Sequence, residues 1–129
     1  MKKVIHSNQA PKAIGPYSQA VVVGQLLFTS GQLGLDPITG NLMEGGVEAE
    51  ARQALVNLGY ILNEAGCVYP DVIKTLVFLK DINDFARVNT IYGEFFRENP
   101  PARSAVQVAA LPKGAAIEIE AIANIGAMK

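Results

Sequence analysis

Two stretches of the chain are apolar on both sides of the strand that each predicts, and they limit the possible folds. "VVVGQLLF" spans residues 21–28 and "TLVFL" spans 75–79, and neither shows the alternation of a strand with one face in water. A sheet that contains them needs cover on both faces. Because the rest of the chain predicts only two helices, we expect helices on one face and another subunit on the other.

Local patterns give the elements of the first half of the chain. A short strand in "KKVIH" and a turn-rich loop come first, and Gly24-Gln25 then separates two apolar runs as in a tight hairpin. From Val47 to Ala65 apolar residues recur at three- and four-residue spacing, which predicts a helix. Gly66 directly after it is a typical helix stop.

The second half predicts a strand over "VIKTLVFLK", a helix that begins at Asp81 or Asn83, and two final strands joined by "LPKG". We expect these last strands, "ARSAVQVAA" and "AIEIEAIANI", to form a hairpin. The order is therefore strand–strand, helix, strand, helix, strand–strand, with a short strand at the N-terminus. This pattern indicates one α+β domain over residues 1–129.

Composition excludes several function classes. Charged residues make up 18% of the chain, below the usual ~25%, as expected where surface is buried between subunits. The net charge of −1 and the lack of a basic run argue against nucleic-acid binding. One cysteine and one histidine allow no internal disulfide or Cys/His zinc site. No apolar run has the length of a membrane span or a signal-peptide core, so we expect a cytoplasmic protein without membrane contact.

Arg103 is the most unusual residue of the chain, because it lies inside a run that otherwise predicts a buried strand. In a hairpin with its turn near Pro112, Glu118 lies opposite Gln107 and Arg103 is roughly 13 Å further along. Arg103 then either faces water, pairs with another carboxylate, or binds an anionic ligand. Glu118 and Glu120 alternate along their strand, a pattern typical of a solvated face.

Three further residues are candidates for a site. Asn89 lies on the apolar stripe of the second helix, where an amide needs a partner. Gly31 in "TSGQ" ends a strand, where a bulge or a close approach of the backbone to a ligand are both plausible. Tyr17 is either a core or turn aromatic or part of a pocket. Cys67 and His6 form no recognisable nucleophilic arrangement.

Four segments, in this order, closely resemble the Rid family of reactive intermediate deaminases: "IGPYSQA", "TSGQ", "VFLKDINDFARVN" and "PARSAVQVAALPKGAAIEIEAIA". The resemblance covers essentially the whole chain and is closest to the RidA-type 2-iminobutanoate/2-iminopropanoate deaminases. It implies a chorismate mutase-like α+β fold of βαββαβ type, with two helices on one face of the sheet. It also implies a homotrimer with the other face at its core and with ligand sites between subunits.

The resemblance implies hydrolysis of 2-aminoacrylate, 2-aminocrotonate and their imines to 2-keto acids and ammonia, without a metal or an organic cofactor. Arg103 matches the family arginine that binds the substrate carboxylate, and Glu118 matches the glutamate that acts on the hydrolytic water. Tyr17, Gly31 and Asn89 match residues around the ligand.

One position departs from the family pattern. Many members carry Cys where this chain has Ala105. The backbone at that position can still contact a ligand, but a thiol has no role there. Two other functions stay open at this point: an endoribonuclease or translation inhibitor, and a non-catalytic trimer that binds small carboxylates.

Overall fold

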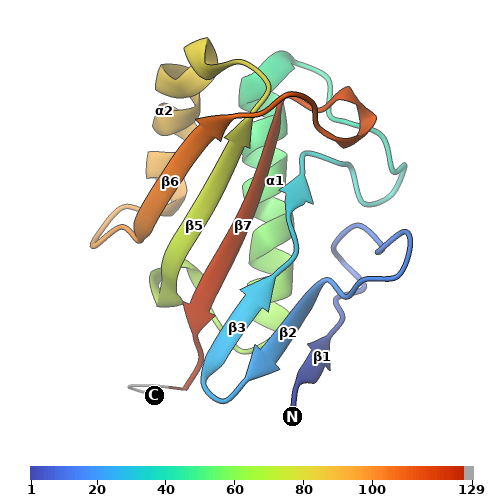
Figure 1. Cartoon of the computed structure of the whole chain (residues 1–129), viewed down its shortest axis with the longest axis vertical. Helices are drawn as coiled ribbons and strands as arrows, with labels where there is room; N and C mark the ends of the chain where they lie inside the picture. Colours follow the sequence, from blue (N-terminus) through green and yellow to red (C-terminus); the bar gives the residue numbers. More distant parts are fainter. Residues whose placement is uncertain (127–129) are drawn as a thin grey trace.

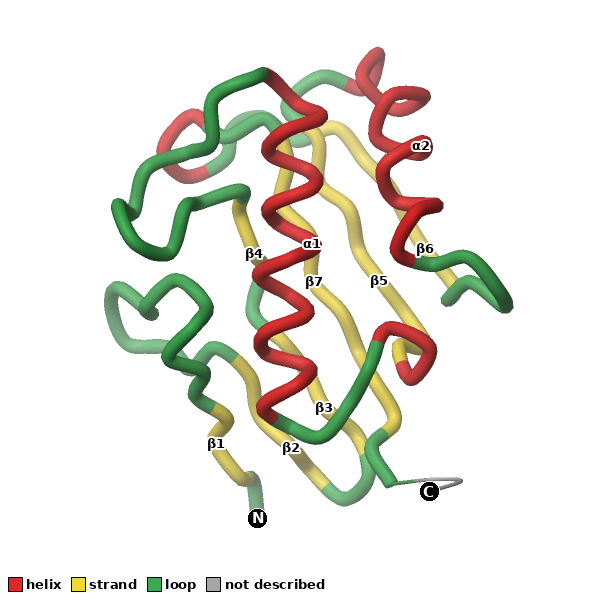
Figure 2. The backbone as a smooth tube through the Cα atoms, turned by 180° about the vertical axis from the view of Figure 1, so that it is seen from behind, coloured by secondary structure: helices red, strands yellow, loops and turns green. Residues whose placement is uncertain are grey.

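The computed structural model describes residues 1–126 as a seven-stranded mixed sheet with two α-helices on one of its faces (Figures 1 and 2). The elements follow the predicted order, with the short strand β4 in addition: β1 (Lys3–Ile5), β2 (Ala20–Val23), β3 (Leu26–Thr29), β4 (Gln32–Leu33), α1 (Gly46–Glu64), β5 (Val72–Leu79), α2 (Phe85–Phe95), β6 (Ala102–Gln107) and β7 (Ile117–Asn124). The last three residues of the expected 1–129 domain lie outside the described part.

The short-range predictions are confirmed. Gly24 and Gln25 form the two-residue loop between β2 and β3, and Gly24 has a φ of +60°. Gly66 follows α1 with a φ of +80°, and its N–H bonds to the Asn63 carbonyl at 3.0 Å. The cap prediction holds only for the short 3₁₀ turn that precedes α2, where Asp81 accepts a bond from the Asn83 N–H; α2 itself begins at Phe85 without a side-chain cap bond.

The predicted hairpin of the last two strands is wrong. The strands are arranged β1-β2-β3-β7-β5-β6, so β5 lies between β6 and β7. β6 pairs with β5 in parallel, and β7 pairs with β5 antiparallel. The reason is the helix α2 between β5 and β6, because strands joined by a helical crossover lie parallel in one sheet. The βαββαβ order is wrong as well, because one strand, β5, lies between the two helices and two strands, β6 and β7, follow the second helix.

The helices cover one face of the sheet, as expected. Every second residue of β7 is buried on that face (Ile117, Ile119, Ala121 and Ala123). α1 packs on it through seven apolar residues with full or nearly full burial: Val47, Ala51, Ala54, Leu55, Leu58, Ile61 and Leu62. The core therefore lies between the sheet and α1, with α2 beside it.

The opposite face of the sheet is uncovered in the single chain, and it is largely apolar. Its larger apolar side chains are exposed or half-buried: Val21, Val23, Leu26, Phe28, Leu76, Phe78, Val106 and Ile122. Such a patch on a small protein usually marks an interaction surface. Glu118 and Glu120 lie on this same face, beside Phe78 and Leu76 in the register.

A bulge interrupts the strand formed by β3 and β4. Phe28 pairs with Ile122 and Gln32 pairs with Ile119, so three residues, 29–31, oppose two residues of β7. The Thr29 hydroxyl takes the place of a ladder bond by accepting from the Ala121 N–H at 3.0 Å. Bulges re-aim side chains and are common next to functional sites, and this one places Gly31 against Glu118.

Candidate functional site

Arg103 lies on the helix-covered side of β6, at the edge of the sheet, in register with the buried Thr75 of β5. Its guanidinium donates to the Asn89 side-chain carbonyl at 2.8 Å. It also lies over two rings of α2, 4.8 Å from the centre of Tyr92 and 5.1 Å from that of Phe85. Asn89 thus has the partner that its place on the apolar stripe demanded.

Among residues 1–126 no carboxylate neutralises this arginine, since none of their ion pairs involves Arg103. Arg103 borders a cavity of about 390 Å³, which we call the Arg103 cleft. The cleft is lined by Asn89, Tyr92, Gly93, Phe96, Pro100, Pro101 and Arg103. A half-buried cation with an amide and two aromatic faces around it retains the capacity to bind an anion.

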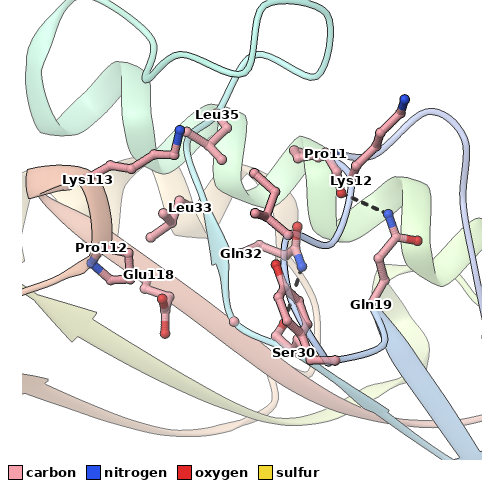
Figure 3. Close-up of a pocket in the computed structure, with 13 residues that line it drawn as sticks. Pro11, Lys12, Gln19, Ser30, Gln32, Leu33, Leu35, Pro112, Lys113 and Glu118 are labelled. Carbon is pink, nitrogen blue, oxygen red and sulfur yellow. Dashed lines mark hydrogen bonds between the residues drawn. The ribbon is translucent and has the colours of Figure 1, made fainter.

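A second cavity, of about 480 Å³, contains three of the other predicted residues: Tyr17, Gly31 and Glu118. We call it the Glu118 pocket. Figure 3 shows Glu118 entering it from β7 on one side, with Pro11, Lys12 and Gln19 of the N-terminal loop on the other. A Cβ added to Gly31 would lie 2.5 Å from Glu118 Cδ, so only glycine leaves this place for the carboxylate.

Hydrogen bonds fix the loop that carries Tyr17 to the bulge. The Ser30 hydroxyl donates to the Ser18 carbonyl at 2.6 Å, and the Ser30 N–H donates to the Gln19 carbonyl at 2.8 Å. The Gln19 amide in turn donates to the Pro11 carbonyl at 2.9 Å (Figure 3). Tyr17 itself is 52% exposed, so it is a pocket wall and not a core aromatic.

The environment of Glu118 suits proton transfer. Burial, reinforced by the charge of Glu120, raises the pKa of the Glu118 carboxyl above its ordinary value. A carboxylate with a raised pKa is a stronger base, and general-base catalysis works best when the pKa approaches the working pH. The expectation that Glu118 belongs to a plainly solvated face therefore does not hold, because the side chain is half-buried in a pocket.

The structure does not bring Arg103 and Glu118 together in one chain. Arg103 is on the helix-covered face, in register with Thr75, whereas Glu118 is on the uncovered face, in register with Phe78. Two strand spacings and three residues of rise separate their Cα atoms by roughly 14 Å. Their cavities share no lining residue. The separation that the sequence predicted is present, but the sheet order and not a hairpin produces it.

Ala105 points its side chain to the helix-covered side, where it packs against the core. Its backbone is more accessible, because β6 is the last strand of the sheet. The Val108 N–H bonds to Leu79 of β5 at 2.9 Å. Since backbone groups alternate in direction along a strand, those of Ala105 and Arg103 face the free edge.

The sequence did not identify the aromatic contacts of Arg103. Phe85 and Tyr92 read as ordinary members of the apolar stripe of α2, although the stripe also contains Asn89. The sequence signal that could have indicated these contacts was the amide of Asn89 between Phe85 and Tyr92 on one face of the helix. Within residues 1–126, no group of His, Cys, Asp and Glu has an arrangement that could hold a metal ion, and no helix is long and apolar enough to cross a membrane.

Comparisons with known proteins agree over nearly the whole chain. The model of the family described as Endoribonuclease L-PSP matches residues 7–125. The 2-iminobutanoate/2-iminopropanoate deaminases of Homo sapiens and Rattus norvegicus are 57% and 59% identical over 126 residues, which is 98% of this chain and 92% of each relative.

Solved structures give the same result. A crystal structure from Thermotoga maritima has a TM-score of 0.95 at 48% identity and covers 98% of this chain and 100% of its own. E. coli TdcF, solved with bound serine, has a TM-score of 0.90 at 47% identity and covers 95% of this chain and 98% of its own. With this sheet, these two cavities and these relatives, the chain belongs to the Endoribonuclease L-PSP family, the family of the Rid proteins.

Proposed function

We propose that this protein is an imine deaminase that hydrolyses 2-imino acids, and the enamines from which they form, to 2-keto acids and ammonia. Relatives at 57% and 59% identity over almost the full chain carry the name 2-iminobutanoate/2-iminopropanoate deaminase. The observation that carries the proposal is the pair of half-sites: a cation without an internal carboxylate and a carboxylate with a raised pKa. These are the groups that a small imino acid requires.

The two half-sites form one site when copies of the chain assemble through the uncovered sheet face. Three copies in a ring would place the Arg103 cleft of one subunit beside the Glu118 pocket of the next, and the apolar face would be buried at the centre. The exposed Phe28 and Val106 on that face support such burial. A homotrimer also accounts for the low charge content of the chain.

Recognition of the substrate begins at its carboxylate. Arg103 can bind a planar carboxylate through two parallel N–H···O bonds, which fix both position and orientation. The free-edge backbone of Ala105 lies next to it and needs no thiol to contact the ligand. Serine bound to E. coli TdcF has the same carboxylate and 2-nitrogen arrangement as a 2-imino acid, which supports a site for this class of compound.

The chemistry then needs one water and one proton carrier. Glu118 takes a proton from the water as the water oxygen forms a bond to the carbon of the protonated imine, and the C=N π electrons move to the nitrogen. Glu118 then returns this proton to the amino group of the carbinolamine. The C–N bond breaks and ammonia leaves as the C=O bond forms, and the hydroxyl proton passes to Glu118, which releases it to the ammonia. Because a protonated imine is already electrophilic, positioned acid–base help of about 10²–10⁴-fold is adequate.

A coupled assay tests the function. A pyridoxal-phosphate-dependent threonine dehydratase releases the enamine, and 2-ketobutyrate is followed with and without this protein. We expect faster keto-acid formation, loss of that acceleration in Glu118→Ala with carboxylate binding retained, and loss of both in Arg103→Ala. Glu120→Ala is the matched control, since it changes the same residue type on the same face of β7 outside the pocket and retains most of the turnover.

The outcomes separate the alternatives. A wild-type protein of three times the 13.7 kDa chain mass that binds 2-ketobutyrate but leaves the rate at the buffer value is a carboxylate-binding trimer and not a deaminase. Cleavage of RNA that is lost in the same variants would instead support the endoribonuclease function in the family description. The net charge of −1 and a carboxylate within the pocket oppose binding of a phosphate backbone.

A further inference from the structure

The contacts of Arg103 with the described residues contain no charge, which is unusual for a half-buried guanidinium. Asn89 accepts one N–H of the guanidinium. The guanidinium carbon lies 4.8 Å from the centre of the Tyr92 ring and 5.1 Å from that of Phe85. An internal carboxylate would satisfy the cation but would compete with the substrate for it. Aromatic faces and one amide stabilise the cation and leave its remaining donors free.

Tyr92 differs from Phe85 because it is anchored at its far end. Its hydroxyl lies 2.7 Å from the Thr75 hydroxyl, and Thr75 is fully buried in β5. The ring is 4.6 Å from that of Phe96, and Phe96 contacts Tyr69 edge-on at 5.7 Å. Tyr92 is therefore held at its hydroxyl by Thr75 and at its ring by the buried Phe96, and the Arg103 guanidinium lies over the same ring.

Thr75 is also the residue of β5 that lies in register with Arg103. Thr75 thus fixes both the backbone of Arg103, through strand pairing, and the Tyr92 ring, through the hydroxyl pair. A shift of the Tyr92 ring would therefore move the guanidinium of Arg103 relative to the backbone of Arg103. No polar atom other than the Thr75 hydroxyl is a hydrogen-bond partner of the Tyr92 hydroxyl among residues 1–126.

We propose that Tyr92 is a positioning residue for carboxylate recognition: the hydroxyl pair Thr75–Tyr92 fixes the ring that holds the Arg103 guanidinium in the plane needed for two parallel bonds to the ligand. The proposal rests on the proposed function, because it assigns the ligand carboxylate to Arg103. It goes beyond that function by naming two residues that act on the ligand through Arg103. A bidentate contact depends on the orientation of the planar fork, so loss of the support weakens binding even though the charge remains.

The test measures binding of 2-ketobutyrate, the stable keto-acid product, and of its uncharged amide 2-oxobutanamide by NMR titration. The variants are Tyr92→Phe and Thr75→Val, each of which removes one hydroxyl of the pair, with Thr75→Ser as the conservative rescue. Tyr69→Phe is the matched control. This variant also removes a tyrosine hydroxyl bond, the half-buried one to the Leu55 carbonyl at 2.6 Å, but Tyr69 is not among the residues that hold the Arg103 guanidinium.

We expect Tyr92→Phe and Thr75→Val to raise the Kd for 2-ketobutyrate three- to tenfold and to leave the Kd for the amide within twofold. In the coupled assay KM rises by the same factor while kcat stays within twofold, because the lost contact stabilises ground and transition states alike. Thr75→Ser and Tyr69→Phe bind as the wild type does. In an Arg103→Ala background, Tyr92→Phe has no further effect, since its route to the ligand has been removed.

Three results would overturn the proposal. One is carboxylate binding within twofold of wild type in both hydroxyl variants. Another is an equal loss in Tyr69→Phe, which would make the effect a general consequence of disturbing the core. The third is an undiminished effect of Tyr92→Phe without Arg103. If Tyr92→Phe does not fold, the comparison of Thr75→Val with Thr75→Ser decides. A wild type that binds 2-ketobutyrate in this Tyr92-dependent way but hydrolyses no imine refutes the function and leaves this inference standing.

Discussion

Replacing Gly31 by alanine tests whether the position of the Glu118 carboxylate matters for activity. The new Cβ would lie 2.5 Å from Glu118 Cδ and 2.8 Å from its Cγ, and both distances are well inside van der Waals contact. The backbone of Gly31 has no positive φ, so alanine adds no conformational strain. The whole perturbation therefore falls on the carboxylate.

The magnitude follows from what can move. Overpacking a rigid core costs about 1–3 kcal/mol, but the Glu118 side chain is half-buried and has a free path toward the pocket. We expect it to rotate away, so that the free energy of unfolding changes by less than about 1 kcal/mol. A displacement of about 1 Å at a reacting group can lower the rate up to ~10²-fold. We therefore expect kcat/KM to fall by about 10- to 100-fold in a stable protein.

The assay pairs urea denaturation with the dehydratase-coupled rate of keto-acid formation. Gly34→Ala is the matched control, because Gly34 flanks β4 on its other side and its Cβ would lie 2.5 Å from the Cα of Glu50 in α1, where no side chain can yield. That variant should lose stability, whereas Gly31→Ala should lose activity. The double variant Gly31→Ala/Glu118→Ala should regain any stability lost through the clash.

One result would refute the reasoning about this pocket: a Gly31→Ala protein with wild-type kcat/KM and wild-type stability. It would mean that the carboxylate occupies another place during turnover. A large loss of stability that Glu118→Ala does not relieve would refute the assignment of the clash.

Four further outcomes are expected. Burial and the charge of Glu120 raise the pKa of Glu118, so the folded state holds the proton of this carboxyl more tightly than the unfolded chain does. The free energy of unfolding should therefore decline as the pH rises from about 4.5. Glu118→Gln should remove this decline in urea denaturation measured at a series of pH values. Glu120→Gln should lower the pKa of Glu118 and move the acid limb of the pH–rate profile to lower pH. Asn57→Ala should cost roughly 2–4 kcal/mol in urea denaturation, since its amide donates to two carbonyls, those of Leu33 and Leu35, at 3.1 and 2.9 Å. Phe28→Asp should yield a folded but inactive monomer in light scattering, because it places a charge on the uncovered sheet face.

Much of the fold was predictable because the signals were local. The hairpin at Gly24-Gln25, the helix stop at Gly66 and the alternation along β7 each depend on a few neighbouring residues. The uncovered apolar face was also predictable, since two-sided apolar strands and only two helices leave one face without cover. These features follow from turn geometry and periodicity, which depend on residues close together in the sequence.

The candidate residues other than Ala105 line the two cavities. They were named mostly through resemblance to a family, and their roles stay predictions. From the residues alone, Asn89 gave the clearest signal, because an amide on an apolar stripe must bond to something, and it bonds to Arg103. The close approach at Gly31 was one of two open interpretations, and the structure shows both a bulge and a side chain against it. Neither signal identified Tyr92 or Thr75.

The sequence by itself determined the elements, their faces and the need for cover on the second side of the sheet. Only the tertiary structure decided that β6 pairs with β5 and not with β7. That choice depends on contacts between residues far apart in the chain, which local propensity does not encode. It places Arg103 and Glu118 on opposite faces of one sheet, so the two groups of the proposed site can act together only between two copies of the chain.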